Sequence, residues 1–211
     1  MATPAEERNR RLGESVAAAL CARHFDAQYC ETVKEAVAAA VRLIPQGASV
    51  TFGGSMTIRD TGLVAALKEG NYRVFDRDEI PPAARTAFVH EHFFSDFFLA
   101  SANAVSEDGV IYNMDGAGNR VASLIYGPRE VILLVGLNKI AKDEQSAVAR
   151  VRGTAAPINA QRFDITTPCR KTGRCADCKS TDSICCTMTV MRLCRPAGRI
   201  HVILFGESYG Y

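Results

Sequence analysis

The chain has 211 residues, 47% of them hydrophobic, and a formal net charge of +2, which suits one α/β domain with a sizeable core. Its basic side chains are dispersed along the sequence, so the composition argues against nucleic acid as the main partner. No apolar run reaches the length of a membrane span, and the first residues lack the apolar core of a signal peptide. We therefore expect a cytoplasmic protein with no membrane partner.

The amino-terminal part of the chain is predicted to be helical. Apolar side chains recur at helical spacing over Pro4–Phe25, and we expect residues 1–27 to form a helical extension. A short link at Ala27–Cys30 separates this extension from a second predicted helix over Thr32–Ile44. Residues 28–211 are then expected to form the α/β domain.

A glycine-rich turn follows the first predicted strand of that domain. The strand covers residues 48–52, and a helix is predicted over Ile58–Lys68, with Thr57 and Asp60 resembling a capping box. The turn between them contains Gly53, Gly54, Ser55 and Thr57. A strand, then glycines with hydroxyls, then a helix start is how α/β proteins present backbone N–H groups to an anion. A tight turn that needs glycine explains the same residues, so both interpretations stay open.

Polar residues also follow later strands. Strands are predicted over residues 71–75, 97–101, 110–112, 131–135 and 199–205, and helices over residues 82–94 and 143–152. Asn138 and Lys139 come directly after a very apolar strand, at the end where open α/β sheets place their ligands. Residues 113–120 are dense in Gly, Asn and Asp and end in Asn119 and Arg120. The guanidinium fork of Arg120 suits a carboxylate or a phosphate, although turns explain such a composition as well.

Six of the eight cysteines lie in a segment near the end of the sequence, which Pro157 and Pro168 precede. The spacing C-x5-C-x2-C-x6-C is formed by Cys169, Cys175, Cys178 and Cys185. Cysteines buried for packing occur singly among apolar neighbours, whereas these have many charged neighbours. The C-x2-C pair lets two thiolates reach one metal centre, and the positive charges nearby favour the thiolate form.

Three interpretations of this cysteine segment, residues 168–195, are considered. Disulfides belong to secreted chains, and a chain of this length does not need them to fold. Four cysteines can hold a structural zinc ion. A 4Fe–4S cluster also takes four thiolates, and a single C-x2-C followed by unequal gaps favours a cluster over a zinc ribbon. The spacing leaves the fourth ligand open between Cys185, Cys186 and Cys194.

Several short segments share a pattern with a known family. They are Gly53–Thr57, Ser95–Asp96, Ser101–Ala104, Asp108–Gly109, Gly118–Arg120, Tyr126–Pro128 and Gly136–Lys139. Together they resemble the LUD domain, the lactate utilization domain, from about Gln28 onward, and in particular a branch with a cysteine-rich C-terminal loop. In that pattern the fourth cysteine corresponds to Cys185, while Cys186 stands where the pattern has none. The resemblance thus implies that Cys169, Cys175, Cys178 and Cys185 are the metal ligands.

The resemblance also implies a fold and a metabolic setting. The fold would be that of the sugar-phosphate isomerase and CoA-transferase superfamily, a mainly parallel sheet flanked by helices. The setting would be the bacterial oxidation of L-lactate to pyruvate, alongside iron–sulfur oxidoreductase subunits. Because fold analogy does not by itself carry function, the substrate needs evidence from the site.

Our leading hypothesis is a protein that binds a 4Fe–4S cluster and serves the redox metabolism of lactate or a related organic acid. It would either pass electrons or bind the acid beside the cluster. Arg120 and Lys139 would hold the carboxylate, and the turn at Gly53–Thr57 would donate N–H groups. The other candidate ligand-binding residues are Asn103, Asn119 and Asn138. The candidate proton carriers, chosen by loop position, are Asp96, Asp108 and Asp115.

Two alternatives come from other classes of protein. The first is a non-redox enzyme or binding protein for a phosphorylated or CoA-linked small molecule, in which zinc fixes the cysteine segment. The same glycine turn and Arg120 would then hold a phosphate. The second is an assembly subunit of a larger iron–sulfur oxidoreductase. Whether the chain is an enzyme and whether it forms a homo-oligomer stay open.

Overall fold

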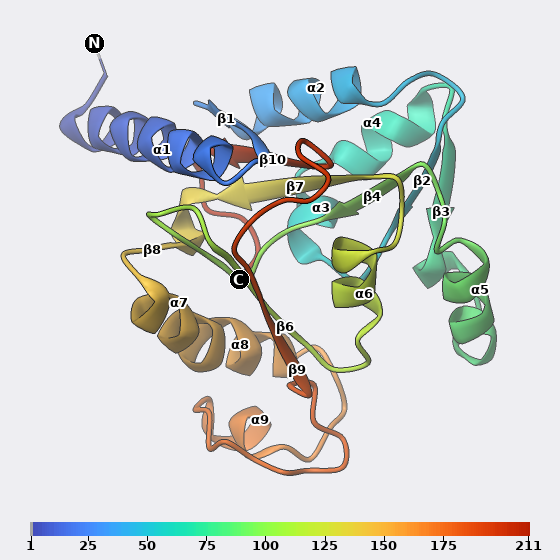
Figure 1. Cartoon of the computed structure of the whole chain (residues 1–211). Coiled ribbons are helices and arrows are strands. Elements are labelled where there is room, and N and C mark those ends of the chain that lie inside the picture. The colour runs from blue at the N-terminus through green and yellow to red at the C-terminus, as the bar shows by residue number, and fades with distance from the viewer. Residues whose placement is uncertain (1) are drawn as a thin grey trace.

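Six parallel strands form the main sheet of the computed structural model, which describes residues 2–211 (Figure 1). Their order is β1-β10-β7-β4-β2-β3, and every neighbouring pair runs parallel. The strands are β1 (Asp26–Cys30), β2 (Ser49–Phe52), β3 (Arg73–Asp76), β4 (Phe97–Ala100), β7 (Glu130–Gly136) and β10 (Ile200–Phe205). The predicted α/β fold with a mainly parallel sheet flanked by helices is confirmed.

Helices cover both faces of the main sheet. They are α1 (Pro4–Ala22), α2 (Val33–Leu43), α3 (Met56–Asp60), α4 (Leu63–Glu69) and α6 (Asn119–Ile125). Because side chains alternate along a strand, Val131 and Leu133 of β7 pack on the side of α1 and α6. Ile132 and Leu134 pack on the side of α2, α3 and α4. The centre of the sheet is therefore buried on both faces.

Helix α1 begins where the sequence predicts. Thr3 is its N-cap and forms a capping box with Glu6. The Thr3 side chain accepts from the Glu6 N–H, and the Glu6 side chain accepts from the Thr3 N–H. Val16 and Leu20 are fully buried in the core that also contains β7 and β10. The separation of residues 1–27 as an extension stays a prediction. Among the helices of residues 2–211, none is long and apolar enough to cross a membrane.

The segment predicted as a link after α1 is instead the edge strand β1. It pairs with β10 from Asp26 opposite His201 to Cys30 opposite Phe205. Asp26 Oδ2 lies 2.6 Å from His201 Nδ1, across a sequence separation of 175 residues. The prediction of a link was wrong because the strand has mostly half-exposed side chains, without the alternation that marks a strand in a sequence. Its partner also lies far away in the sequence.

The helix predicted over Ile58–Lys68 is two helices, α3 and α4. They are separated at Gly62, whose φ of +82° is left-handed and interrupts the helix. The predicted capping box of Thr57 and Asp60 is wrong, because Ser55 is the N-cap and its side chain accepts a hydrogen bond from the Ile58 N–H. Thr57 is buried and faces the site described below.

A second, four-stranded sheet lies beside the main one, in the order β8-β5-β6-β9. Its strands are β5 (Ala104–Ser106), β6 (Ile111–Asp115), β8 (Ile140–Ala141) and β9 (Thr187–Met191). β5 and β6 pair antiparallel as a hairpin. β9 was not predicted, and it pairs with β6 so that Thr187 lies opposite Asp115. The predicted loop at 113–120 is shorter than expected, since β6 runs to Asp115 and α6 begins at Asn119.

A continuous helical run follows β8. It consists of α7 (Glu144–Arg150), a π-helical turn at Val151–Ala155 and α8 (Ala156–Ala160). Pro157 lies inside this run, at the start of α8 where the π-helical turn ends, so the helix predicted over residues 143–152 continues to Ala160. The run and the short helix α9 (Pro168–Thr172) lie at the end of the molecule away from α2 and α4 (Figure 1).

The remaining helical segments are short. They are three 3-10 turns, η1 (Arg77–Glu79), η2 (Pro82–Ala84) and η3 (Leu137–Lys139), and the helix α5 (Arg85–Glu91). The helix predicted over residues 82–94 is therefore shortened to α5 after a 3-10 turn. Two of the 3-10 turns, η1 and η3, begin directly after β3 and β7 and carry charged residues at the carboxyl edge of the sheet.

Candidate functional site

A pocket with a volume of about 260 Å³ lies at the carboxyl edge of the main sheet. From β2 the chain first adds β3 on one side of the sheet and then returns to add β4 on the other side of β2. The strand order therefore reverses between β2 and β4. Open α/β sheets bind ligands at such a switch point. The pocket is lined there by Gly53 after β2, Ser101 after β4 and Lys139 after β7. The parallel strands thus bring together residues that are distant in the sequence.

Most of the predicted site residues outside the cysteine segment line this pocket. They are Gly53, Gly54, Ser55, Thr57, Asn103, Asp115, Asn119, Arg120 and Lys139. The pocket wall also contains Arg77 and Arg162, so four basic side chains line it. Asp115 is the one acidic side chain in the described lining. This excess of positive charge favours an anionic ligand.

Lys139 is the most buried charged group of the pocket wall, with 2% of its surface exposed. Its Nζ lies 2.8 Å from Thr57 Oγ1 and 2.9 Å from Ser101 Oγ. Burial lowers the pKa of Lys139 from 10.5 to about 7, and the positive charges of Arg150 and Arg120 add to this effect. Both partners of the amine within the described chain are neutral hydroxyls, so it is poised between its charged and neutral forms near pH 7.

Arg120, in the first turn of α6, is held by groups from β6 and the strand connection before it. Its Nε donates to Asp115 Oδ2 at 3.4 Å, and its Nη atoms donate to Asn113 Oδ1 at 3.2 Å and Asn103 Oδ1 at 3.0 Å. The Met114 carbonyl accepts a further bond. Asp115 also accepts from the Gly118 N–H at 3.1 Å. These contacts fix the guanidinium in the pocket wall, and 21% of the side chain is exposed.

Gly54 lies between two further arginines. A Cβ added at Gly54 would lie 3.0 Å from an Nη of Arg77 and 3.7 Å from an Nη of Arg162. Arg162 also donates to the Gly54 carbonyl at 2.9 Å. The backbone of Gly54 does not have a positive φ, so the turn itself does not require glycine there. A small side chain at this position would meet the flexible end of Arg77.

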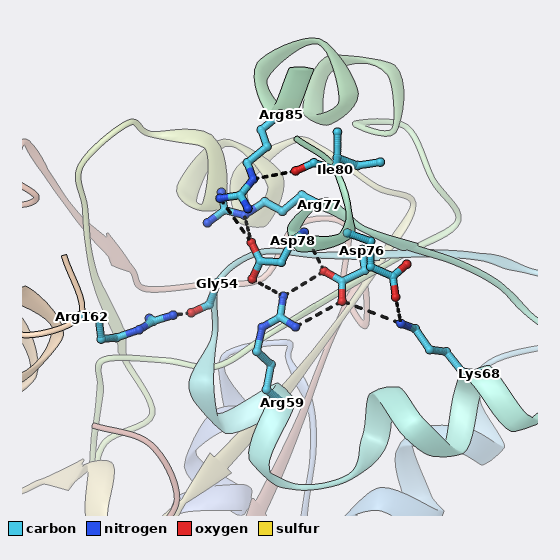
Figure 2. A network of polar contacts seen from close by, with 10 residues as sticks. Gly54, Arg59, Lys68, Asp76, Arg77, Asp78, Ile80, Arg85 and Arg162 are labelled. Carbon is cyan, nitrogen blue, oxygen red and sulfur yellow. Dashed lines mark hydrogen bonds and ion pairs between the residues drawn. The ribbon is translucent and has the colours of Figure 1, made fainter. Parts of the chain in front are cut away.

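An ion-pair network beside Gly54 occupies the nearby acidic groups (Figure 2). Arg59 donates to both carboxylate oxygens of Asp76, at 2.9 and 3.2 Å. These bonds lower the pKa of Asp76 against the opposing effect of its burial. Asp78 lies 2.6 Å from Arg59. The buried Nε of Arg77 lies 3.8 Å from Asp78 Oδ1, beyond hydrogen-bond distance, and no hydrogen bond is identified for the Nη atoms within the described chain. Arg77 thus keeps donors for a ligand.

The end of the chain covers one side of the pocket. Gly210 and Tyr211 line it, and the Tyr211 hydroxyl donates to Asn159 Oδ1 at 3.2 Å. A Cβ on Gly210 would lie 2.3 Å from Thr57 Oγ1 and 3.3 Å from Lys139 Nζ. Gly210 also has a left-handed φ of +59°, so this position requires glycine both for its conformation and for its approach to Thr57.

Three predicted residues lie outside the pocket. Asp96 directly precedes β4, at the opposite edge of the sheet, and accepts hydrogen bonds from the Ser49 N–H at 2.9 Å and from the Ser49 hydroxyl at 2.6 Å. Asp108, in the turn between β5 and β6, pairs with Arg23 at 2.6 Å. Asn138 donates to the Gly210 carbonyl at 3.3 Å. Of the three predicted proton carriers, Asp115 is the one that the structure brings to the pocket.

The predicted cysteine ligands lie near one another, with Cys169 buried, Cys178 and Cys185 partly buried and Cys175 exposed. The pKa of Cys185 is raised to about 11, first by burial and then by Cys169, Cys175, Cys178 and Cys186. Hydrogen bonds with Ser180 lower the pKa of Cys178. Even so, within residues 2–211 no three His, Cys, Asp or Glu side chains are arranged to hold a metal ion. The thiols are therefore neighbours, but their present separations are not those of a closed metal site.

The cysteine segment touches the pocket. The Cys186 N–H donates to the Asp115 carbonyl at 2.9 Å. Ile184 lines the pocket, and its Cα would lie 3.0 Å from a Cβ added at Gly116. Cys194 is different, because it is buried in the main core and its Sγ lies 3.1 Å from the Pro196 carbonyl. The segment around Cys185 thus forms part of the pocket rim.

Sequence reasoning did not single out several residues of the pocket. Arg77 follows the end of β3, so the rule that identified Lys139 after β7 could also have found it. Ser101 lies within a segment that resembles the family pattern and follows β4 in the same way. Arg162 and Tyr211 gave no local signal, because the helical run and the chain end reach the pocket only through tertiary packing.

Comparisons with known proteins identify the family. The family model of the LUD domain matches residues 13–205. Among solved structures, the chain is similar to a DUF162 family protein from Deinococcus radiodurans, with a TM-score of 0.57 and 13% identity, over 94% of this chain and 98% of the other. At this identity the likeness shows the fold alone. A comparison with curated proteins gives no match. Because the family model spans most of the sequence, the chain belongs to the LUD domain family.

Proposed function

We propose that the protein binds a small organic acid in the pocket and serves the redox metabolism of lactate or a related acid. The observation that carries this proposal is the charge of the pocket wall, where Arg77, Arg120, Lys139 and Arg162 face a single carboxylate, Asp115. An anion entering such a wall gains several charge-assisted hydrogen bonds. The family name, lactate utilization, directs the choice of acid to lactate and its relatives.

Arg120 and Lys139 have the donors that this binding requires. The guanidinium has five N–H donors, and four contacts within the chain are identified for it. The ammonium form of Lys139 has three donors, of which Thr57 and Ser101 take two. Each group thus retains a donor for a carboxylate. Asp115 orients Arg120 through its Nε and is the group beside the ligand that can accept a proton.

The cysteine segment supports a metal site at the rim of the pocket as part of the same proposal. Cys169, Cys175, Cys178 and Cys185 match a 4Fe–4S cluster in number and kind of donor, and they interact electrostatically with one another. Because the segment has no helix or strand between α9 and β9, binding of the metal group can draw the thiols together, as metal binding does in other small sites. A bound cluster would supply one-electron transfer beside the acid. An iron–sulfur oxidoreductase subunit is then the expected electron partner.

A specific observation favours a second candidate function. Arg77 and Arg162 converge on Gly54, and two guanidinium groups suit a phosphate better than a lone carboxylate. The protein would then be a non-redox enzyme or binding protein for a phosphorylated or CoA-linked molecule, and zinc would fix the cysteine segment. The two functions differ both in the metal bound and in the arginines that contact the ligand.

Metal analysis and ligand binding on anaerobically purified protein test both candidates. About four irons and four sulfides per chain, with a broad visible absorption band, support the cluster; one zinc without sulfide supports the alternative. Calorimetry with lactate, pyruvate, phosphoglycolate and CoA then identifies the ligand class. We expect Arg120→Ala to lose binding of lactate and pyruvate, while Arg129→Ala, an exposed residue outside the pocket, should retain it. If neither acid binds, the proposed function is wrong.

A further inference from the structure

The amine of Lys139 has an environment that a simple carboxylate anchor does not need. It is 2% exposed, and its hydrogen-bond partners in the described chain are two hydroxyls, Thr57 and Ser101. The charges that act on its pKa, those of Arg150 and Arg120, are positive, and both disfavour the ammonium form. Burying a lysine without an acidic partner costs stability. A neutral amine in a pocket wall is a nucleophile.

The hydrogen bonds around Lys139 also have a defined direction. The Thr57 hydroxyl has one hydrogen, and it donates this hydrogen to the Tyr209 carbonyl at 3.4 Å. Thr57 must therefore accept its bond from Lys139. The Ser101 hydroxyl has no other hydrogen bond within residues 2–211, so it can rotate to accept from Lys139 or donate to it.

This arrangement orients the lone pair of the neutral amine. When Lys139 donates to Thr57 and Ser101, both N–H bonds are used, and the lone pair takes the remaining tetrahedral direction. Lys139 lines the pocket, and Gly210, the closest part of the chain end, has no side chain to cover the amine. A Cβ there would lie 3.3 Å from Nζ. Absence of a side chain at this position leaves room for a ligand atom.

We propose that the Lys139 amine forms an imine with the carbonyl carbon of a small 2-oxo acid in the pocket, an inference that rests on the proposed binding of organic acids there. A 2-oxo acid is the oxidised form of a 2-hydroxy acid such as lactate, so the pocket that binds one suits the other. Arg120 holds the carboxylate, and the neighbouring carbonyl carbon then lies toward Lys139.

The chemical step needs no further reactant. The nitrogen lone pair forms the C–N bond, the carbonyl π electrons move to oxygen, and a proton passes from nitrogen to that oxygen to give a carbinolamine. The C–O bond then breaks, the second nitrogen proton leaves with the oxygen, and the products are the imine and one water. The Ser101 hydroxyl, which has no other partner in the described chain, relays the proton, and Thr57 can accept from a protonated imine.

Reductive trapping tests the inference. The full-length protein is incubated with pyruvate, reduced with sodium borohydride and examined by intact mass and peptide mapping. We expect one carboxyethyl group per chain, attached to Lys139. The yield should increase as the pH rises through about 7, because the amine then loses its proton. Labelling spread evenly over exposed lysines would overturn the inference.

Three variants sharpen this test. Lys139→Arg keeps the positive charge but not the nucleophile and should lose the adduct, while Lys142→Arg, which alters an exposed lysine three residues away, should retain it. Ser101→Ala should slow trapping at least several-fold with the fold intact by circular dichroism. If Lys139→Arg does not fold, the mapped position of the adduct in the unaltered protein decides the question.

Failure of this inference differs from failure of the proposed function. If calorimetry shows pyruvate bound while borohydride gives no adduct at Lys139, the imine is excluded and the organic-acid site stands. If neither lactate nor pyruvate binds, the proposed function fails, and the imine inference fails with it. Binding together with an adduct at Lys139 supports both.

Discussion

The pocket and the cysteine segment, to which we assign the two proposed chemistries, differ in how firmly their side chains are held. Lys139 and Arg120 extend from elements packed on buried strands, and contacts from several elements hold each side chain in place. Cys175 and Cys186 are exposed, and the segment around them has little regular structure between α9 and β9. The pocket is thus organised before its ligand arrives, whereas the thiols need a bound group to fix their geometry. The segment touches the pocket through Ile184 and the Cys186 backbone, but no thiol lines the described pocket, so loss of one thiol should affect ligand binding only weakly.

The largest expected effect is loss of the metal group from the cysteine segment alone. Cys178→Ser should abolish binding of iron and sulfide, because a four-thiolate site then lacks a ligand. The affinity for lactate should change by less than about tenfold, or about 1.4 kcal/mol. Metal analysis and calorimetry measure the two effects, with Cys21→Ser, an exposed cysteine on α1, as control. Loss of both activities in Cys178→Ser would show that the two regions are not independent.

Removal of the Arg120 guanidinium should have the next largest effect, and this effect concerns the pocket. Arg120→Ala leaves Asp115 without its ion-pair partner and deprives Asn103 and Asn113 of a donor. We expect the free energy of unfolding to fall by about 3 kcal/mol, measured by urea denaturation. Arg129→Ala should change it by less than about 0.5 kcal/mol. Equal stability of both variants would mean that Arg120 is not held as the contacts indicate.

The pH dependence of stability tests the burial of Lys139. Its pKa is lowered from 10.5 to about 7, so between these two values the unfolded chain binds more protons than the folded one. The free energy of unfolding then rises with pH between the two pKa values, by at most about 1.4 kcal/mol per pH unit. Below the lower pKa the folded protein carries the full penalty for burying the charged amine. Lys139→Met should lack this rise.

Urea unfolding at several pH values measures the difference between the unaltered protein and Lys139→Met. Lys142→Met should keep the pH dependence of the unaltered protein, since Lys142 is exposed. A difference that stays constant from pH 6.5 to pH 9 would contradict an amine poised near neutrality.

The smallest effect concerns the arginine pair at Gly54. Gly54→Ala places a Cβ 3.0 Å from the flexible end of Arg77, which can move, so we expect a stability change below about 1 kcal/mol. Affinity for phosphoglycolate should fall several-fold if Arg77 and Arg162 contact its phosphate. Gly153→Ala is the matched control, because a Cβ there meets no atom within 4 Å. If affinity for lactate falls instead, the arginine pair belongs to the organic-acid site.

Local patterns in the sequence were sufficient for much of the fold and of the site. The apolar run of β7 and the helical spacing of α1 identified both elements, because burial imposes its own periodicity on a segment. The glycine-rich turn after one strand identified Gly54, and polar residues after another identified Lys139, since the carboxyl ends of parallel strands meet at one edge of the sheet. The spacing of the cysteines identified a group of neighbouring thiols. In each case the signal lies within a few residues.

Tertiary structure alone decided the remainder, since it depends on contacts between distant segments. β1 is a strand because β10, about 175 residues later, supplies its partner. Asp96 and Asp115 were both predicted as proton carriers, but Asp96 precedes β4 and lies at the opposite edge of the main sheet, whereas Asp115 ends β6 of the second sheet, which packing places beside the pocket. Arg162 reaches Gly54 across 108 residues. The sequence by itself determined which residue types follow each strand. Packing determined which of these residues line one pocket, and therefore the net charge of the pocket wall.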